Sequence, residues 1–268
     1  MDGLQRSASD LLEQVIPIAR KAGQAIMAVY GTDHVVNSKA DKSPVTEADV
    51  RAEAIILAAL RTLTPDIPIV AEEAAAGGEL PSISDKFWLV DPLDGTKEFI
   101  SRNGEFTVNI ALIRQGMPVM GVVFAPALQR LFAGAQGTGA FIEDALGRRP
   151  IRCRPAPPEG LTVVASRSHG DAAALDAFLA GRKVASLASA GSSLKLCLVA
   201  AGEADLYPRL GRTMEWDIAA GHAVLLAAGG RITDIGGKIL AYGKPGFENP
   251  HFVAMGDDRQ GVNIATET

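Results

Sequence analysis

The sequence has little of several features that would mark other classes of protein. Its 268 residues include two cysteines, Cys153 and Cys197, with no Cys-x-x-Cys pair, so no disulfide framework is expected. No uncharged apolar run approaches ~18 residues, so no membrane span is indicated. The first ten residues are polar and contain no apolar core of a signal peptide. We therefore expect a cytoplasmic protein with reduced thiols.

Positive charge is also sparse. Lys and Arg number 26 against 31 Asp and Glu, which gives a net charge of −5, and no basic block stands out. Nucleic acid polymers and anionic membrane surfaces are therefore poor candidates as partners, whereas a small anionic substrate is compatible with this charge. The histidines lack zinc-type spacing, and no signature of a Ser–His–Asp or Cys–His nucleophile is present. Any chemistry would depend on carboxylates and a divalent cation.

Hydrophobic periodicity divides the chain into two parts. Apolar residues at three- and four-residue spacing predict helices over 11–30 and 47–63, the second with Thr46 as its N-cap. Apolar runs separated by turn residues then predict an antiparallel sheet, with a hairpin over 106–124.

The composition changes at 144–160, which is rich in Arg and Pro and predicts a boundary between two subdomains. Beyond it strands and helices alternate, as in an α/β layer. The fold class is therefore α/β with an α+β first half. We place one subdomain over 1–150, with the antiparallel sheet, and a second over 151–268.

The most informative stretch is 88–100. Its apolar start predicts the end of a buried strand, and Asp91 and Asp94 follow on a turn stiffened by Pro92. Such carboxylates can hold Mg²⁺, which prefers a few carboxylates together with water and phosphate. Gly95 and Thr96 would begin a short helix whose amides face an anion. Alternatively, Asp-Pro-x-Asp-Gly forms only a turn.

Three further acidic positions have a structural and a functional interpretation. The adjacent Glu72 and Glu73 end a strand, either as a solvated pair or as ligands of a cation shared with the central stretch. Asp217 precedes an apolar helix, and it either caps this helix or serves as a ligand of the metal site. Asp49 suits the positive end of the second helix as a capping residue.

Polar loops in the second half offer groups that could bind an anion. They end strands or begin helices, where hydroxyl and cationic side chains could equally serve as caps. The candidate residues are His169, Ser192, Lys195 and Arg209.

The ordered set of Glu72-Glu73, Asp91-Pro-Leu-Asp94-Gly-Thr96 and Trp216-Asp217 resembles the Mg²⁺-dependent, lithium-sensitive phosphatases of the inositol monophosphatase superfamily. The resemblance covers nearly the whole chain. Lys97-Glu98-Phe99 and Gly104-Glu-Phe-Thr-Val-Asn109 resemble the bacterial 3'(2'),5'-bisphosphate nucleotidase branch. Ala71 departs from the pattern, because many members have Gly before the Glu pair.

The resemblance implies a layered α/β/α/β/α sandwich with the site between two subdomains. It implies two or three Mg²⁺ ions. Their ligands would be Glu72, Glu73, Asp91, the Leu93 carbonyl, Asp94 and Asp217. It implies catalytic roles for Asp49, Thr96 and Glu72, with Thr96 hydrogen-bonded to Asp49 and orienting the attacking water. The implied substrate-binding residues are Gly95, Thr96, His169, Ser192, Lys195 and Arg209.

The implied activity is hydrolysis of 3'-phosphoadenosine 5'-phosphate to AMP and phosphate, in sulfur metabolism. An inositol monophosphatase or sugar bisphosphatase of the same superfamily is the alternative. A metal-dependent nucleotide-binding protein without turnover is a third hypothesis. The sequence leaves the oligomeric state open.

Overall fold

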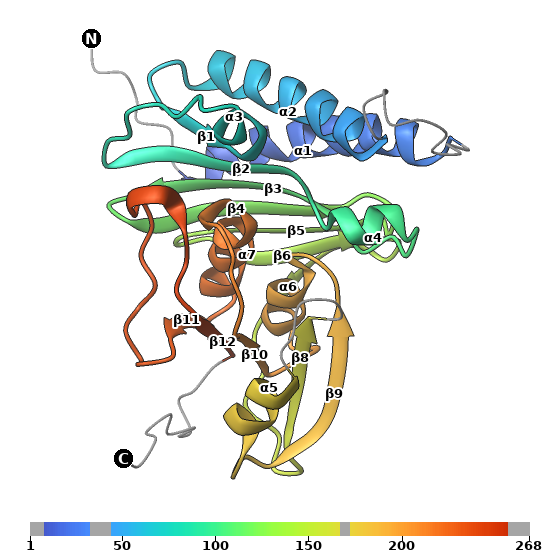
Figure 1. The fold of residues 1–268 in the computed structure, drawn as a ribbon, viewed down its shortest axis with the longest axis vertical. Helices are drawn as coiled ribbons and strands as arrows, with labels where there is room; N and C mark the ends of the chain where they lie inside the picture. Colours follow the sequence, from blue (N-terminus) through green and yellow to red (C-terminus); the bar gives the residue numbers. More distant parts are fainter. Residues whose placement is uncertain (1–7, 33–43, 167–171, 257–268) are drawn as a thin grey trace.

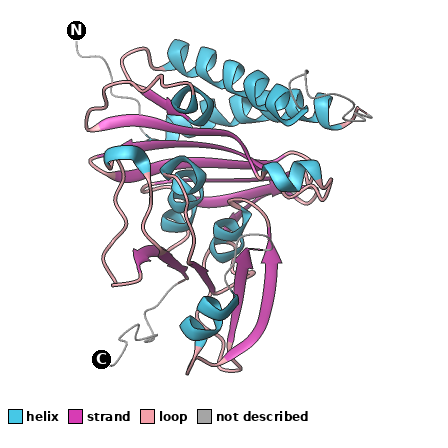
Figure 2. Cartoon of the chain, viewed as in Figure 1, coloured by secondary structure: helices cyan, strands magenta, loops and turns pink. Residues whose placement is uncertain are grey.

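The computed structural model of this chain describes residues 8–32, 44–166 and 172–256. Helices and sheets alternate in layers (Figure 1). The helices α1 (Ala8–Tyr30) and α2 (Pro44–Leu63) are outermost and cover a large sheet. Below that sheet lie α6 (Leu194–Ala200) and α7 (Glu215–Ala227), then a small sheet, and then α5 (Ala172–Leu179). This is the α/β/α/β/α order that the resemblance implies, and that prediction is confirmed. Figure 2 shows the same alternation of helical and strand layers.

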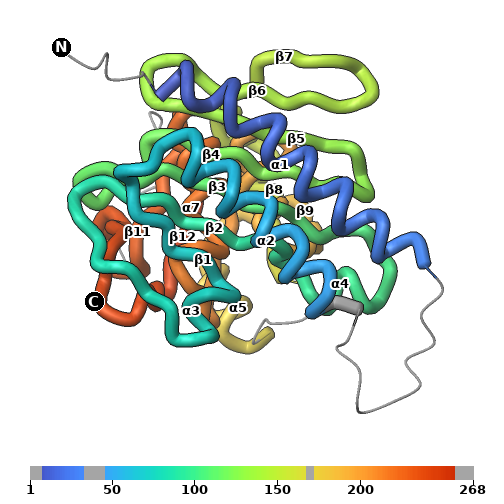
Figure 3. Tube along the Cα trace, turned by 90° about the horizontal axis from the view of Figure 1, so that it is seen from above, coloured from blue at the N-terminus to red at the C-terminus, as the bar shows by residue number. Residues whose placement is uncertain are grey.

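The outer helices α1 (Ala8–Tyr30) and α2 (Pro44–Leu63) lie side by side over the large sheet (Figure 3). Their inner faces pack on strand residues in one apolar core. Pro17 does not delay the start of α1, because the helix begins at Ala8 and runs through this exposed residue. Thr46 is not an N-cap, since α2 begins at Pro44, a residue suited to the first helical position.

The large sheet is antiparallel except that its first two strands are parallel. Its strands follow chain order: β1 (Ile69–Ala71), β2 (Lys86–Asp94), β3 (Thr107–Arg114), β4 (Met117–Ala125), β5 (Arg130–Ala135), β6 (Gly139–Asp144) and β7 (Gly147–Ile151). The predicted hairpin is confirmed as β3 and β4. The Arg- and Pro-rich stretch that begins at residue 144 contains β7, a strand that the sequence patterns do not predict and that lies at the sheet edge, where Pro150 is tolerated.

The small sheet has the order β11-β12-β10-β8-β9, with β8 parallel to both β9 and β10. Its strands are β8 (Leu161–Ser166), β9 (Val184–Ala190), β10 (Leu206–Arg209), β11 (Arg231–Asp234) and β12 (Phe252–Met255). The helices are α5 (Ala172–Leu179), α6 (Leu194–Ala200) and α7 (Glu215–Ala227), with a 3₁₀ turn at Pro245–Phe247. The predicted strand–helix alternation is confirmed, and β12 is an addition that the sequence patterns do not predict.

Helix α7 lies between the two sheets and positions the second half against the first. At Gly121 of β4 an added Cβ would lie 2.4 Å from the Ala220 carbonyl oxygen, so only glycine allows this approach. Strands of the large sheet end by Ile151 and those of the small sheet begin at Leu161. The division into subdomains at 150/151 stays a prediction.

Candidate active site

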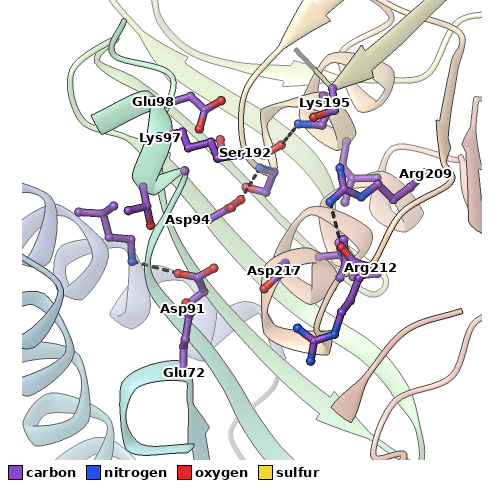
Figure 4. A pocket seen from close by; sticks show the side chains of 18 of the residues that line it. Glu72, Asp91, Asp94, Lys97, Glu98, Ser192, Lys195, Arg209, Arg212 and Asp217 are labelled. Atoms are coloured by element: carbon purple, nitrogen blue, oxygen red, sulfur yellow. Dashed lines mark hydrogen bonds between the residues drawn. The ribbon is translucent and has the colours of Figure 1, made fainter. Parts of the chain in front are cut away.

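A pocket of about 410 Å³ lies where the large sheet meets the starts of α6 and α7. Acidic side chains from both halves of the chain gather on one side of it and face Lys195 and Arg209 on the other (Figure 4). Its ionisable lining residues are Glu72, Asp91, Asp94, Lys97, Glu98, Lys195, Tyr207, Arg209, Arg212 and Asp217. We call Glu72, Asp91, Asp94 and Asp217 the acidic side of the pocket, and Lys195 and Arg209 its cationic side; Lys97 lies apart from the cationic side, next to Glu98 (Figure 4).

The central stretch reaches the pocket as a bulged strand end. β2 continues to Asp94 and its pairing with β3 shifts between Asp91 and Asp94, so the predicted turn after Val90 is wrong. The Leu93 amide donates to Asp91 Oδ1 at 3.0 Å. Gly95 follows with φ of 98° and leads into the predicted short helix, α4 (Thr96–Ile100). A left-handed residue here requires glycine.

Glu72 and Asp91 interact directly in the acidic side of the pocket. Glu72 begins the short helix α3 (Glu72–Ala76), and its carboxyl group shares a hydrogen bond with that of Asp91. Burial raises the pKa of Glu72 to about 7, and burial with the charge of Glu72 raises that of Asp91 well above its usual range. Two such groups share a proton or require a cation between them.

Asp94 and Asp217 bring the two halves of the chain together. Asp94 Oδ2 accepts the Ser193 amide at 2.6 Å, while Asp217 Oδ2 accepts the Met214 amide at 2.8 Å. Burial raises the pKa of Asp94 to about 6 despite nearby Lys195. Burial and the charge of Asp94 raise that of Asp217 to about 8. Asp217 therefore caps the start of α7, as the structural interpretation predicts, and it also lines the pocket. Its role as a metal ligand stays a prediction.

Asp49 and Glu73 lie beside the pocket and are not among its lining residues. Asp49 sits more than one turn inside α2, so the capping role is wrong. Burial, followed by the charges of Glu73 and Glu72, raises its pKa to about 8. Among the described residues we find no hydrogen bond between Asp49 and Thr96, and the water-orienting role of this pair stays a prediction.

The acidic side has the donor chemistry that suits a hard divalent cation. Buried carboxylates with raised pKa values are the groups whose ionised form Mg²⁺ would stabilise. Within residues 8–32, 44–166 and 172–256, however, no three His, Cys, Asp or Glu side chains form a group that could hold an ion as they stand. The structure brings Glu72, Asp91, Leu93, Asp94 and Asp217 to one pocket. Which of them become ligands stays a prediction.

Most of the predicted substrate-binding residues line the pocket, and Lys195 and Arg209 form its cationic side. Gly95, Thr96, Ser192, Lys195 and Arg209 line the pocket, and His169 lies outside the described residues. The Lys195 ammonium donates to the carbonyls of Ala190 at 3.1 Å and Ser192 at 2.6 Å. Burial lowers the pKa of Lys195 to about 8. These groups surround space that an anion could fill.

The chain is similar to known proteins over most of its length. A family model described as the inositol monophosphatase family matches residues 7–260. The chain belongs to the inositol monophosphatase family. The superfamily resemblance seen in the motifs is thereby confirmed.

Relatives in this family are similar over most of their length. The chain is 53% identical over 245 residues to the protein named 3'(2'),5'-bisphosphate nucleotidase CysQ of Escherichia coli O6:H1, covering 90% of this chain and 98% of that one. The CysQ crystal structure from Bacteroides thetaiotaomicron superposes with a TM-score of 0.81 at 38% identity, covering 95% and 99%. An inositol monophosphatase from Zymomonas mobilis gives 0.79 at 25%, covering 94% and 95%.

Several residues that line the pocket are not among the site residues predicted from the sequence. Glu98, Lys97 and Arg212 line the pocket, as do Ser193 and Tyr207. Lys97 and Glu98 stand in a motif noted only for its resemblance. Arg212 follows the strand that ends at Arg209, in a segment without helix or strand whose course the local sequence pattern does not predict.

Glu215 anchors the start of α7 next to Asp217. Its fully buried carboxylate accepts hydrogen bonds from the amides of Gly243 at 2.7 Å and Lys244 at 2.9 Å, and from the Lys244 ammonium at 2.6 Å. This network holds the helix that presents Asp217 to the pocket.

We expect Glu215→Ala to lower the free energy of unfolding by about 3–5 kcal/mol, because it leaves the amides of Gly243 and Lys244 without their acceptor and the Lys244 ammonium without its carboxylate partner. Chemical denaturation would measure this change. Glu248→Ala is the matched control, since it removes an exposed ion pair with Arg212, 3.0 Å long, worth about 1 kcal/mol or less. Similar losses for the two variants would contradict the anchoring role.

Proposed function

We propose that this chain is a Mg²⁺-dependent phosphomonoesterase that removes the 3'-phosphate of 3'-phosphoadenosine 5'-phosphate and yields AMP and phosphate. The observation that carries the proposal is the pocket itself, in which acidic residues from both halves face Lys195 and Arg209. A substrate with two phosphates matches this division, one phosphate at each side. The names of the CysQ relatives support the same activity.

The acidic side would hold two or three Mg²⁺ ions through Glu72, Asp91, the Leu93 carbonyl, Asp94 and Asp217, with Glu73 close by. Bound there, Mg²⁺ would supply a low-pKa water and charge neutralisation at the phosphate. In the reaction a water oxygen forms a bond to phosphorus while the bond from phosphorus to the 3'-oxygen breaks, and that oxygen takes up a proton. Thr96, with Asp49, would orient the water, and the Gly95 and Thr96 amides would hold the scissile phosphate.

The cationic side would recognise the rest of the nucleotide. Lys195 and Arg209 would pair with the 5'-phosphate, and Ser192 and His169 would contribute polar contacts. Because the pocket buries Lys195, an anion there faces little competition from water.

Inhibition by lithium, a role in sulfur metabolism and a cytoplasmic location belong to the proposal. No helix in the described residues is long and apolar enough to cross a membrane.

The decisive experiment measures phosphate release from 3'-phosphoadenosine 5'-phosphate and from inositol 1-phosphate. We expect at least about a hundredfold higher kcat/KM for the nucleotide, with activity abolished by EDTA and restored by Mg²⁺. Lithium would inhibit the Mg²⁺-restored activity. Preference for inositol 1-phosphate would keep the acidic side but refute the assignment of Lys195 and Arg209. Binding of nucleotide without phosphate release would favour a protein without turnover.

A further inference from the structure

A cluster of buried polar side chains lies directly behind the pocket. Thr107 and Asn109 of β3 and Ser193, the residue before α6, are 0%, 1% and 3% exposed. The Ser193 hydroxyl donates to Asn109 Oδ1 at 2.6 Å and lies 2.9 Å from the Thr107 hydroxyl. These contacts join positions 84 and 86 residues apart, so they connect the large sheet to the second half of the chain.

The cluster is aligned with the acidic side of the pocket. In the β2–β3 ladder Asn109 pairs with Asp91 and Thr107 pairs with Asp94, across the bulge. The Ser193 amide in turn donates to Asp94 Oδ2 at 2.6 Å. One residue of the second half is therefore held by its side chain to β3 and by its backbone to Asp94.

We call residues 191–193 the recognition loop, because it contains Ser192 and precedes Lys195. It is fixed at its other end as well, where the Gly191 amide donates to Glu105 Oε2 at 2.8 Å. An added Cβ at Gly191 would lie 2.5 Å from Glu98 Cγ and 2.7 Å from the Glu105 carbonyl oxygen. The loop is thus pressed against α4 and the segment that leads into β3.

Between these two anchors the backbone is strained. Ser192 has φ of 46°, a left-handed conformation that non-glycine residues adopt at a cost. Such a conformation persists only where the surrounding contacts enforce it. Its carbonyl accepts the Lys195 ammonium at 2.6 Å, so the position of that charge depends on the conformation of the loop.

We propose that Thr107 and Asn109 are positioning residues that fix the recognition loop, and with it Lys195, relative to Asp94. They thereby set the distance between the acidic side and the charge that would bind a second phosphate. The inference rests on the proposed function. It means that two side chains of β3 help the enzyme to prefer bisphosphate over monophosphate substrates. Neither side chain is among the residues that line the pocket.

Hydroxyl and amide groups at these buried positions are better explained by positioning than by stability. Buried polar groups cost free energy unless they are hydrogen-bonded, and apolar side chains of similar shape would pack as well. In this cluster Asn109 Nδ2 has no partner within the described residues. A network that leaves one donor unsatisfied is a poor source of stability, yet it defines one docked position of the loop.

The test uses Thr107→Val, which removes the hydroxyl and keeps the shape, and Thr107→Ser, which restores it. Thr233→Val is the matched control, because Thr233 is also buried, with a hydroxyl that has no partner among the described residues, and lies in β11. Each protein is assayed with 3'-phosphoadenosine 5'-phosphate and with adenosine 3'-monophosphate, which lacks the second phosphate. Titration of the first nucleotide in EDTA measures binding without turnover, and thermal unfolding checks folding.

For Thr107→Val we expect kcat/KM on the bisphosphate to fall about tenfold, mainly through KM, and its Kd in EDTA to rise by a similar factor. Activity on the monophosphate should change less than about twofold, and Thr107→Ser and Thr233→Val should behave as the wild type. Equal losses on both substrates, or an unchanged ratio, would overturn the positioning role. Failure of the proposed function would be distinct, because the wild type itself would then hydrolyse neither nucleotide.

Discussion

We expect the Asp94→Asn protein to fold normally and to hydrolyse 3'-phosphoadenosine 5'-phosphate roughly a thousand times more slowly than the wild type. Asp94 lines the pocket below Ser192 in Figure 4, and its charge interacts with those of Asp217 and Lys195. Asparagine keeps an oxygen that can accept the Ser193 amide, so the docking of the two halves should survive. What is lost is the negative charge that the proposed Mg²⁺ site needs.

Steady-state kinetics over a range of Mg²⁺ concentrations would measure this effect, with thermal unfolding in EDTA as the check on folding. The matched control is Asp234→Asn, because Asp234 also accepts backbone amides, those of Gly236 and Lys238 at 2.9 Å each, but does not line the pocket. The control should retain nearly full activity. An Asp94→Asn enzyme within about threefold of the wild type would show that Asp94 is not a metal ligand.

Long elements with strong periodicity could be predicted from the sequence. The outer helices and the β3–β4 hairpin have apolar positions at regular spacing, and a buried face imposes such spacing regardless of the rest of the fold. The same reasoning missed β7, whose Arg, Pro and Gly residues are tolerated because it is an edge strand. Local pattern therefore predicts the buried layers better than the edges.

The site could be predicted in composition but not in local geometry. Asp91 and Asp94 were recognisable as a pair, yet their backbone is a bulge, which depends on the neighbouring strand. The link between Ser193 and β3 joins residues whose proximity only the complete fold determines. Asp217 shows a further limit of prediction from sequence. Its one carboxylate both caps a helix and lines the pocket, and the local sequence does not distinguish a capping residue from a pocket residue.

The second large effect is on stability, which in EDTA should fall as the pH rises from 5 to 8. The unfolded carboxylates titrate near pH 4, whereas folding raises the pKa of Asp94 to about 6, of Glu72 to about 7 and of Asp217 to about 8. Between pH 4 and these raised pKa values, the folded state binds more protons than the unfolded state. Raising the pH therefore favours unfolding, and stability that is complete below pH 4 is lost through the folded pKa values.

Lys195 should limit this effect at the upper end of the range. Its pKa is lowered to about 8, so the folded protein gains relative stability as the pH passes above that value. We therefore expect the decline to be concentrated between pH 5 and 7.5, with Tm falling by on the order of 5 °C in thermal unfolding. Asp217→Asn, which removes one of the raised carboxyl groups, should flatten the profile and raise Tm in EDTA at pH 7.5.

Mg²⁺ should reverse the slope, because it binds the ionised carboxylates of the folded chain and not the unfolded one. Its stabilising effect should grow from pH 5 to 7.5 and should be weaker in the Asp217→Asn and Asp94→Asn proteins. Without Mg²⁺ these carboxylates thus destabilise the folded protein. When Mg²⁺ is present, the same carboxylates give the folded protein its affinity for the cation. A Tm in EDTA that rises with pH over this range, or a Mg²⁺ effect independent of pH, would contradict the proposed metal site.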